Sequence, residues 1–509
     1  MMVQDSVFSQ FPAGVRYLLV LLVSVLSGVL AARGMPRGPV TAQQALLVMG
    51  LSLLLGLMAG LLGGSLWMAL LVPAVTLLTM ELARPDLLGP TVGAVRLDET
   101  YGILAFALGR VFPALIHFLS VLLGIRLALI LNRLMEETPP AAGLFPGVGP
   151  AVSLGLLTAA VIGMVVILLL PGRTPPLTDE EGQQISGSIA RLEQVSLGGQ
   201  PQTILIRAQD PENPVLLYLS GGPGQSDLGY TRVLFENLTD DFVVVSWDQR
   251  GTGKSYPALD PTDDLTIDQA VADTIELTGY LKERFDEEKI YLIGESYGTL
   301  LGVLTVQQRP DLYHAWIASG QMVDIRETDR RLYHRMLEYA EEHQLTGLAA
   351  QMKAYGEPPY EDIPFANGTV MGYYEALYDP YTPPRAYIER GTEANLGPMN
   401  LFSAEYNLVD RINVLRGLID MFTIMYPQLQ QIDFRQDVRE LEVPVYILDG
   451  AAEVSARRDL TLEWFELLEA PEKQLFTFEN AAHSVAFEQF QELDRILNEV
   501  ILPATYPDS

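Results

Sequence analysis

Five long apolar runs, nearly free of charged side chains, dominate the first third of the chain. They cover about Val15–Ala32, Gln44–Leu62, Ser65–Leu82, Val111–Leu131 and Ala151–Leu170. About 20 apolar residues are enough for a helix to cross the hydrocarbon core of a bilayer. Buried globular helices are the alternative, but five such runs would need a large partner surface to cover them. The pattern therefore predicts that residues 1–172 form a multi-span transmembrane region in contact with the lipid bilayer.

The topology of this region is only weakly specified. The first run is the shortest, and Arg16 before it and Leu30-Ala31-Ala32 after it partly fit a signal peptide. Arg33 and Arg37 lie in a short loop without acidic residues, which favours a cytoplasmic loop. Five spans then place the carboxyl half in the cytoplasm, whereas a cleaved first run or one miscounted span reverses that side. His117, inside the fourth run, fits either a polar site or the more common case of a histidine packed between helices.

After a Pro-rich linker at 171–176, strand-like and helix-like runs alternate. Strands are predicted near 203–207, 215–220, 242–247, 289–293, 315–319, 443–448 and 475–478. Helices are predicted near 266–285, 299–309, 460–468 and 487–501. This alternation is typical of a mostly parallel sheet covered on both faces. Between residues 321 and 437 the strand rhythm stops, and the helical, Tyr- and Pro-rich stretch predicts an inserted cap at the ligand-binding edge of the sheet.

Charge separates the two halves of the chain. Residues 1–172 hold eight Arg, no Lys and seven acidic residues, which leaves 25 basic and 56 acidic residues for the rest of a chain of net charge −30. Such acidity argues against nucleic acid as a partner of the carboxyl half. Cysteine is absent, which excludes disulfides, a thiol nucleophile and Cys-ligated metal sites.

The most informative motif is Gly294-Glu295-Ser296-Tyr297-Gly298. It follows a predicted strand and precedes a predicted helix, which is the setting of the nucleophile elbow of α/β-hydrolases. Ser296 is then the nucleophile and needs a histidine base oriented by an acid, in the chain order Ser, Asp or Glu, His. Among the five histidines, only His483 follows a late strand, so we expect it to be the base.

The acid and the oxyanion hole follow from the same fold. The acid is expected after the strand at 443–448, where Glu453 in the following loop is our first choice and Asp449 at the strand end is the rival. The oxyanion hole needs backbone N–H groups, one from Tyr297 after the nucleophile and one from the glycine-rich loop at 220–224. The predicted order is therefore a transmembrane bundle (1–172), an α/β-hydrolase core in two parts (173–320 and 438–509) and a helical cap (321–437).

Three motifs together resemble the prolyl iminopeptidase family of α/β-hydrolases, over about residues 180–505. They are Ser220-Gly-Gly-Pro-Gly224, Asp248-Gln-Arg-Gly-Thr-Gly-Lys-Ser255 and Gly294-Glu-Ser-Tyr-Gly298. The resemblance implies Ser296 as nucleophile, His483 as base, and Gly222 and Tyr297 as the oxyanion hole. Two positions depart from the family pattern: Ser220 replaces a histidine, and Glu453 stands where relatives have Asp. Asp248 and Arg250 are expected to brace loops near the site as an ion pair.

Family members hold the substrate ammonium with carboxylates of the cap. Glu405 is the corresponding choice here, with Asp410 and Glu375 as other acids of the cap. The resemblance thus implies a membrane-anchored aminopeptidase for short peptides that works through an acyl-enzyme, without a metal or organic cofactor. Two alternatives stay open: an esterase or amidase for small acyl substrates, and a catalytically dead hydrolase fold that binds or signals.

Overall fold

The computed structural model describes residues 11–93, 96–135 and 148–506 of the 509-residue chain. The chain folds as two compact units. One unit comprises Met1–Pro171 with Asn407–Ile412, and the other comprises Gly172–Tyr406 with Asn413–Ser509.

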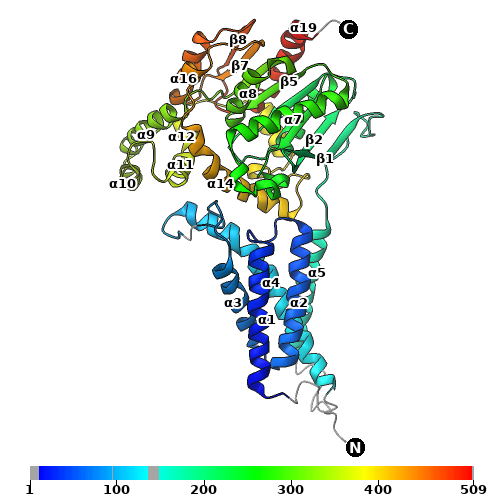
Figure 1. Cartoon of the computed structure of the whole chain (residues 1–509). Helices are drawn as coiled ribbons and strands as arrows, with labels where there is room; N and C mark the ends of the chain where they lie inside the picture. The colour runs from blue at the N-terminus through cyan, green and yellow to red at the C-terminus, as the bar shows by residue number, and fades with distance from the viewer. Residues whose placement is uncertain (1–10, 94–95, 136–147, 507–509) are drawn as a thin grey trace, which may run out of the picture. The chain divides into compact units, whose positions relative to one another are not determined.

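The N-terminal unit consists of apolar helices, drawn in blue to cyan in Figure 1. They are α1 (Ala13–Gly34), α2 (Ala42–Gly63), α3 (Met68–Ala83), α4 (Thr100–Met135) and α5 (Val148–Leu169). Within the described residues, α1, α2, α4 and α5 are the four helices long and apolar enough to cross a membrane. The third predicted span differs: α3 has 16 residues, which is about 24 Å at 1.5 Å per residue, short of a hydrocarbon core of about 30 Å.

Small residues let these helices pack closely. A Cβ atom at Gly56 of α2 would collide with the backbone of Val121 in α4, and one at Gly28 of α1 would lie 2.6 Å from the carbonyl oxygen of Thr76 in α3. Glycine at such positions allows two apolar helices to approach backbone to backbone, which is how helices associate where lipid offers no hydrophobic driving force.

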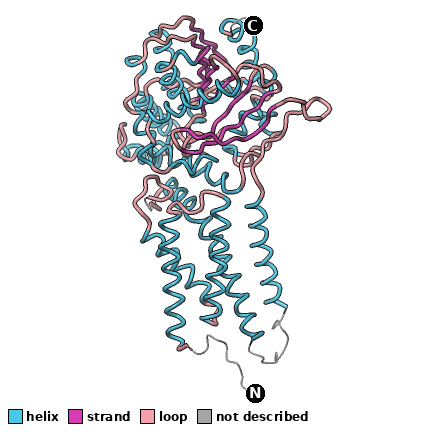
Figure 2. The backbone as a smooth tube through the Cα atoms, turned by 45° about the vertical axis from the view of Figure 1, so that its right-hand side comes forward, coloured by secondary structure: helices cyan, strands magenta, loops and turns pink. Residues whose placement is uncertain are grey.

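The second unit is built on one eight-stranded sheet, whose strands are the magenta segments of Figure 2. The strands are β1 (Ile189–Leu197), β2 (Gln200–Ala208), β3 (Val215–Leu219), β4 (Val243–Asp248), β5 (Ile290–Glu295), β6 (Tyr313–Ser319), β7 (Val445–Gly450) and β8 (Lys473–Phe478). Their order is β1-β2-β4-β3-β5-β6-β7-β8. Only the β1–β2 and β2–β4 pairs are antiparallel, so the mostly parallel sheet predicted from the sequence is confirmed. β1 is an additional edge strand that the sequence reading missed.

Both faces of this sheet are buried, because successive strand residues point to opposite sides. Leu217 and Leu292 pack on one face against the helices α7 (Ile267–Phe285), α8 (Tyr297–Gln308) and α16 (Ser455–Leu467). Leu216 and Ile293 pack on the other face against α6 (Leu228–Leu234), α17 (Val485–Glu488), α18 (Phe490–Ile496), the π-helical turn Leu497–Ile501 and α19 (Leu502–Thr505). This two-sided burial explains why the strands are continuous apolar runs in the sequence.

A helical insertion separates β6 from β7, as predicted. It contains α9 (Ile325–Glu342), α10 (Thr346–Tyr355), α11 (Ile363–Met371), α12 (Tyr374–Leu377), α13 (Arg385–Glu393), α14 (Leu408–Leu429) and α15 (Phe434–Asp437). The helices α9, α10 and α11 form a small core of their own, with Met336 and Met352 fully buried in it.

Candidate active site

Ser296 lies on the turn between β5 and α8. Its backbone has φ 53° and ψ −117°, which a non-glycine residue adopts only under strain, a feature concentrated at functional sites. Close packing explains why both flanking residues are glycines. A Cβ at Gly294 would lie 2.7 Å from the indole ring of Trp316, and one at Gly298 would collide with the carbonyl of Leu219. The local sequence therefore presents the Ser296 side chain at the carboxyl end of the central strand β5.

The structure brings His483 and Glu453 together. Nδ1 of His483 forms a hydrogen bond with Oε2 of Glu453. The other carboxylate oxygen, Oε1, accepts a hydrogen bond of 2.7 Å from the backbone N–H of Val454 and one of 3.0 Å from Arg457. Asp449 has a different partner: Arg458 donates a hydrogen bond of 2.9 Å to its carboxylate. Of the two acids considered from the sequence, Glu453 is the one in position to orient His483.

Electrostatics give this pair the charges that acid–base chemistry needs. Burial by itself would raise the pKa of Glu453, but the positive charge of Arg457 and the contact with His483 lower it to about 2. Burial and the charge of Arg457 lower the pKa of His483, with partial compensation from Glu453. At neutral pH the imidazole is therefore uncharged and can accept a proton, while Glu453 is a carboxylate.

A cavity of about 380 Å³ joins these residues to the insertion. Ser296 and His483 both line it, together with Gly222 of the glycine-rich loop. Much of the remaining wall is apolar and comes from the insertion, including Met371, Val414, Leu418 and Phe422. The cavity has room for a small ligand held between the sheet edge and the helical cap.

The glycine-rich loop follows β3 and runs beside the elbow. A Cβ at Gly221 would be 3.3 Å from Cβ of Ser296, and Gly222 has a φ of +117° that favours glycine. Tyr297 is the first residue of α8 and its ring is buried in the sheet core. Gly222 lines the same cavity as Ser296, and Tyr297 directly follows Ser296 in the chain.

A buried carboxyl pair, Asp227 and Glu295, lies next to Ser296, and the sequence analysis did not predict it. The hydroxyl of Tyr218 lies 3.0 Å from Asp227 and 3.1 Å from Glu295. Asp227 lines the cavity, and Glu295 accepts a further hydrogen bond of 2.6 Å from Ser484. A tyrosine has one proton to donate, so both contacts of Tyr218 are hydrogen bonds only when one of the two carboxyl groups is protonated.

The environment of this pair explains such proton sharing. Burial raises the pKa of both groups, and the charge of Asp227 further raises that of Glu295. Within the described part of the chain, no Lys or Arg forms an ion pair with either group. Asp227 therefore lies in the cavity wall without an ion-pair partner among the described residues, whereas Arg457 of the same wall is paired with Glu453.

Glu405 is not brought to the cavity. It is fully buried, its carboxylate lies 2.7 Å from Arg232, and Ser403 donates a hydrogen bond to it. Neither Asp410 nor Glu375 is among the described residues that line the cavity. Among the described residues, no group of three or more His, Cys, Asp or Glu is arranged to hold a metal ion.

The expected ion pair between Asp248 and Arg250 is not formed. Arg250 instead pairs with Asp273 at 2.9 Å and donates to the carbonyl of Leu197, which fixes the β1–β2 turn. Asp248 accepts hydrogen bonds from Tyr406 at 2.9 Å and from the backbone N–H of Lys254 at 2.8 Å. Both residues brace loops, each with a different partner.

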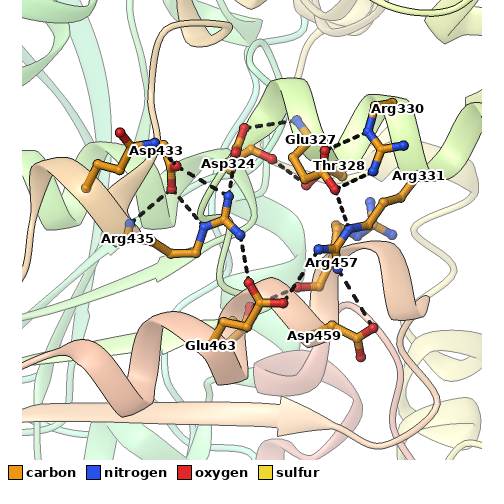
Figure 3. A network of polar contacts seen from close by, with 12 residues as sticks. Asp324, Glu327, Thr328, Arg330, Arg331, Asp433, Arg435, Arg457, Asp459 and Glu463 are labelled. Atoms are coloured by element: carbon orange, nitrogen blue, oxygen red, sulfur yellow. Dashed lines mark hydrogen bonds and ion pairs between the residues drawn. The ribbon is translucent and has the colours of Figure 1, made fainter.

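Two further features lie beside the segments that carry His483 and Arg457. Gly320, after β6, has φ +59°, and a Cβ there would lie 2.5 Å from the carbonyl oxygen and 2.9 Å from Nδ1 of His483. Figure 3 shows Arg435 between Asp324 at 2.8 Å and Glu463 at 2.7 Å. This network connects the start of α9 to α16, the helix that carries Arg457.

Comparisons with known proteins found a matching family model, a relative and similar solved structures. A model of the family described as alpha/beta hydrolase fold matches residues 214–361. A probable aminopeptidase, YbaC of Bacillus subtilis (strain 168), is 31% identical over 303 residues, which cover 59% of this chain and 93% of the relative. Similar solved structures include a proline iminopeptidase-related protein from Thermus thermophilus (20% identity, 63% of this chain and 99% of that chain, TM-score 0.43). A proline iminopeptidase from Mycobacterium smegmatis is similar too (14% identity, 61% of this chain and 98% of that chain, TM-score 0.42).

The fold and the arrangement at the elbow are those of a hydrolase. The chain belongs to the α/β-hydrolase family, and it carries a unit of apolar helices before the hydrolase domain. Within that family, it is homologous to a protein named as a probable aminopeptidase.

Proposed function

We propose that this protein is a serine hydrolase that acts through an acyl-enzyme on Ser296. The observation that carries the proposal is that Ser296 and His483 line one cavity while Glu453 holds Nδ1 of His483. With Nδ1 engaged, Nε2 is the nitrogen that takes the proton of Ser296 as its Oγ attacks the substrate carbonyl. Glu453 stabilises the imidazolium that forms. His483 then gives the proton to the leaving group. In the second half of the reaction, His483 takes a proton from water, the water oxygen attacks the acyl-enzyme, and His483 returns the proton to Ser296 as the acid is released.

The oxyanion of each tetrahedral intermediate is stabilised by the backbone N–H groups of Gly222 and Tyr297. Tyr297 opens α8, so its N–H belongs to the set without partners inside the helix, at the positive end of the helix dipole. Gly222 offers a second donor from a loop where a Cβ would crowd the backbone. Donors fixed in this way require no rearrangement at the moment of reaction.

We further propose that the substrate is a short peptide with a free amino end. The support is Asp227, which lines the cavity and has no cationic partner among the described residues. Asp227 accepts hydrogen bonds from Tyr218 and Gln225 but has no opposite charge beside it. A substrate ammonium would supply that charge, since a buried carboxylate without an ion-pair partner is costly. In this proposal Asp227 takes the role that the sequence assigned to Glu405, whose charge is already balanced by Arg232.

Hydrolysis of small acyl esters is the second candidate. The apolar side chains of Met322, Met371 and Phe422 in the cavity wall favour it, because they suit an acyl chain as well as an apolar amino-acid side chain. The two candidates differ in whether the substrate needs a positive charge near the reacting carbonyl.

The test uses the full chain in detergent micelles. L-prolyl, L-leucyl and L-alanyl anilides are compared with their N-acetylated counterparts and with short acyl esters, and Ser296→Ala is the control. An aminopeptidase cleaves the free-amine anilides and spares the acetylated ones. Cleavage of esters alone supports the second candidate, and no turnover by a folded protein that binds these substrates supports a catalytically dead fold.

Membrane anchoring through residues 1–172 and a cytoplasmic hydrolase domain complete the proposal. Four apolar helices of sufficient length support the anchoring. The side of the membrane rests on Arg33 and Arg37 alone. Because the chain has no cysteine, a single Asp268→Cys substitution on α7 makes the side measurable. A membrane-impermeant maleimide labels it in intact cells only if the hydrolase domain is outside.

A further inference from the structure

A second cavity, of about 390 Å³, lies within the N-terminal unit. Residues of α1 and α2 form most of its wall, and α3 and α4 contribute one residue each, Thr76 and His117. Its rim includes Leu30, Leu51 and Leu54, each more than half exposed. Since a water molecule occupies about 30 Å³ of the liquid, this volume corresponds to about a dozen heavy atoms.

The floor of this cavity is polar, although its wall is apolar. Ser52, Thr76 and His117 line it, and each is at least 94% buried. Oγ of Ser52 lies 2.7 Å from Nδ1 of His117. Within the described residues, neither Nε2 of His117 nor Oγ1 of Thr76 has a hydrogen-bond partner. Two unsatisfied polar atoms on side chains that line one cavity point to a missing ligand, because a buried polar group without a partner is unfavourable.

The chemistry of the wall restricts what that ligand can be. The described lining residues include no Asp, Glu, Lys or Arg, so nothing there balances a charged headgroup. His117 offers either a donor or an acceptor at Nε2, depending on the direction of its bond to Ser52, and the hydroxyl of Thr76 offers both. An uncharged oxygen function on a long apolar chain satisfies these atoms and fills the rest of the cavity.

We propose that this cavity binds a neutral lipid, with its hydroxyl or carbonyl oxygen at His117 and Thr76 and its chain passing the exposed leucines into the bilayer. The site rests on the proposed membrane placement of the helices and does not depend on the catalytic proposal. It gives His117 a role as a ligand-binding residue instead of a residue that only packs between helices.

Photolabelling of the full chain in lipid nanodiscs tests the site. The probes are octadecanol and octadecane that carry the same diazirine at the same chain position, and labelled peptides are located by mass spectrometry. Labelling of α5, where Leu156 and Ile162 are exposed, reports general contact with lipid. We expect the alcohol to label Val48–Met58 at least fivefold more than the alkane does, relative to α5.

His117→Leu should bring that ratio to one while alkane labelling of α5 stays unchanged. Thr76→Val, which keeps the side-chain shape, should lower the ratio in part. Ser24→Ala is the matched control, since Ser24 is buried in α1, donates to the carbonyl of Val20 and does not line the cavity. Equal labelling by the two probes in the unmodified protein, or a ratio that His117→Leu leaves unchanged, overturns the site. An unlabelled α5 would instead contradict the membrane placement, and the lipid site with it.

Discussion

Arg457 follows Glu453 by four residues and donates a hydrogen bond of 3.0 Å to the same carboxylate that holds His483. The Arg457 side chain also lies over the ring of Tyr374, 4.8 Å from its centroid, in the cap. One buried arginine thus touches both the acid of the candidate triad and the insertion above it. This arrangement makes the charge of Arg457 a determinant of the pKa values on which the chemistry depends.

Removal of that charge should shift the pH dependence of the enzyme. Arg457 lowers the pKa of His483, so Arg457→Gln should raise it, and protonation of the base should begin at higher pH. We expect the acid limb of the kcat/KM profile to move upward, whereas Arg457→Lys should move it less. A limb that stays in place or moves downward would show that Arg457 does not act on His483.

The two acids near the base give a paired test. Glu453→Gln should lower kcat by about 10³- to 10⁴-fold, as loss of the orienting acid does in serine hydrolases, with little change in KM. Asp449→Asn removes only a partner of Arg458 and should keep kcat within a few-fold. Steady-state kinetics on one substrate distinguish the two, and the reverse ranking would make Asp449 the acid.

The carboxyl pair predicts a difference between substrates. Asp227→Asn should raise KM for free-amine anilides by about 10- to 100-fold, the range for loss of one hydrogen bond to a charged group. Hydrolysis of any neutral ester should change little. An equal loss on both substrates would mean that Asp227 supports the loop and does not bind the amine.

The same pair predicts how amine binding changes with pH. Burial raises the pKa of Asp227, so this carboxyl takes up a proton at a less acidic pH than an ordinary aspartate. KM for free-amine anilides should therefore rise as the pH falls, and this rise should begin at a higher pH than the pKa of an ordinary aspartate would give. KM for an ester should stay constant. The ratio of the two KM values across pH measures this, and a constant ratio would contradict the assignment.

Gly320 supplies a prediction about positioning. A Cβ there would press on the backbone and ring of His483, so Gly320→Ala should displace the base and lower kcat, by up to about 100-fold for a shift of about 1 Å. Gly347→Ala is the matched control, because a Cβ at that helical position meets nothing within 4 Å. Gly347→Ala should leave kcat unchanged, and equal kinetics of the two variants would exclude a positioning role for Gly320.

The fold was predictable from the sequence because its signals are local. Buried parallel strands such as 243–248 are unbroken apolar runs, and the elbow is a fixed pattern of glycines around Ser296. The order of strand, acid and histidine along the chain likewise predicts Glu453 as the acid and His483 as the base. The length of α3 was harder to predict, since its apolar run begins with residues outside the helix.

The partners of buried charges could not be predicted in the same way. Glu405 has the sequence context of a cap carboxylate, but Arg232, far away in the sequence, pairs with it. Asp227 follows one recognised motif and Glu295 lies inside another, yet only the three-dimensional structure shows that Tyr218 joins them. The signal that was available is their position: Glu295 lies inside the elbow and Asp227 three residues after the glycine-rich loop.

A fluorophosphonate probe, which reacts with activated serines, determines whether Ser296 is the nucleophile. The full chain is treated with the probe, and the adduct is counted by intact mass and located by peptide mapping. We predict one adduct per chain, on Ser296, that is absent in Ser296→Ala and forms much more slowly in His483→Ala. A protein that hydrolyses substrate without forming an adduct, or an adduct on another residue, would show that Ser296 is not the nucleophile.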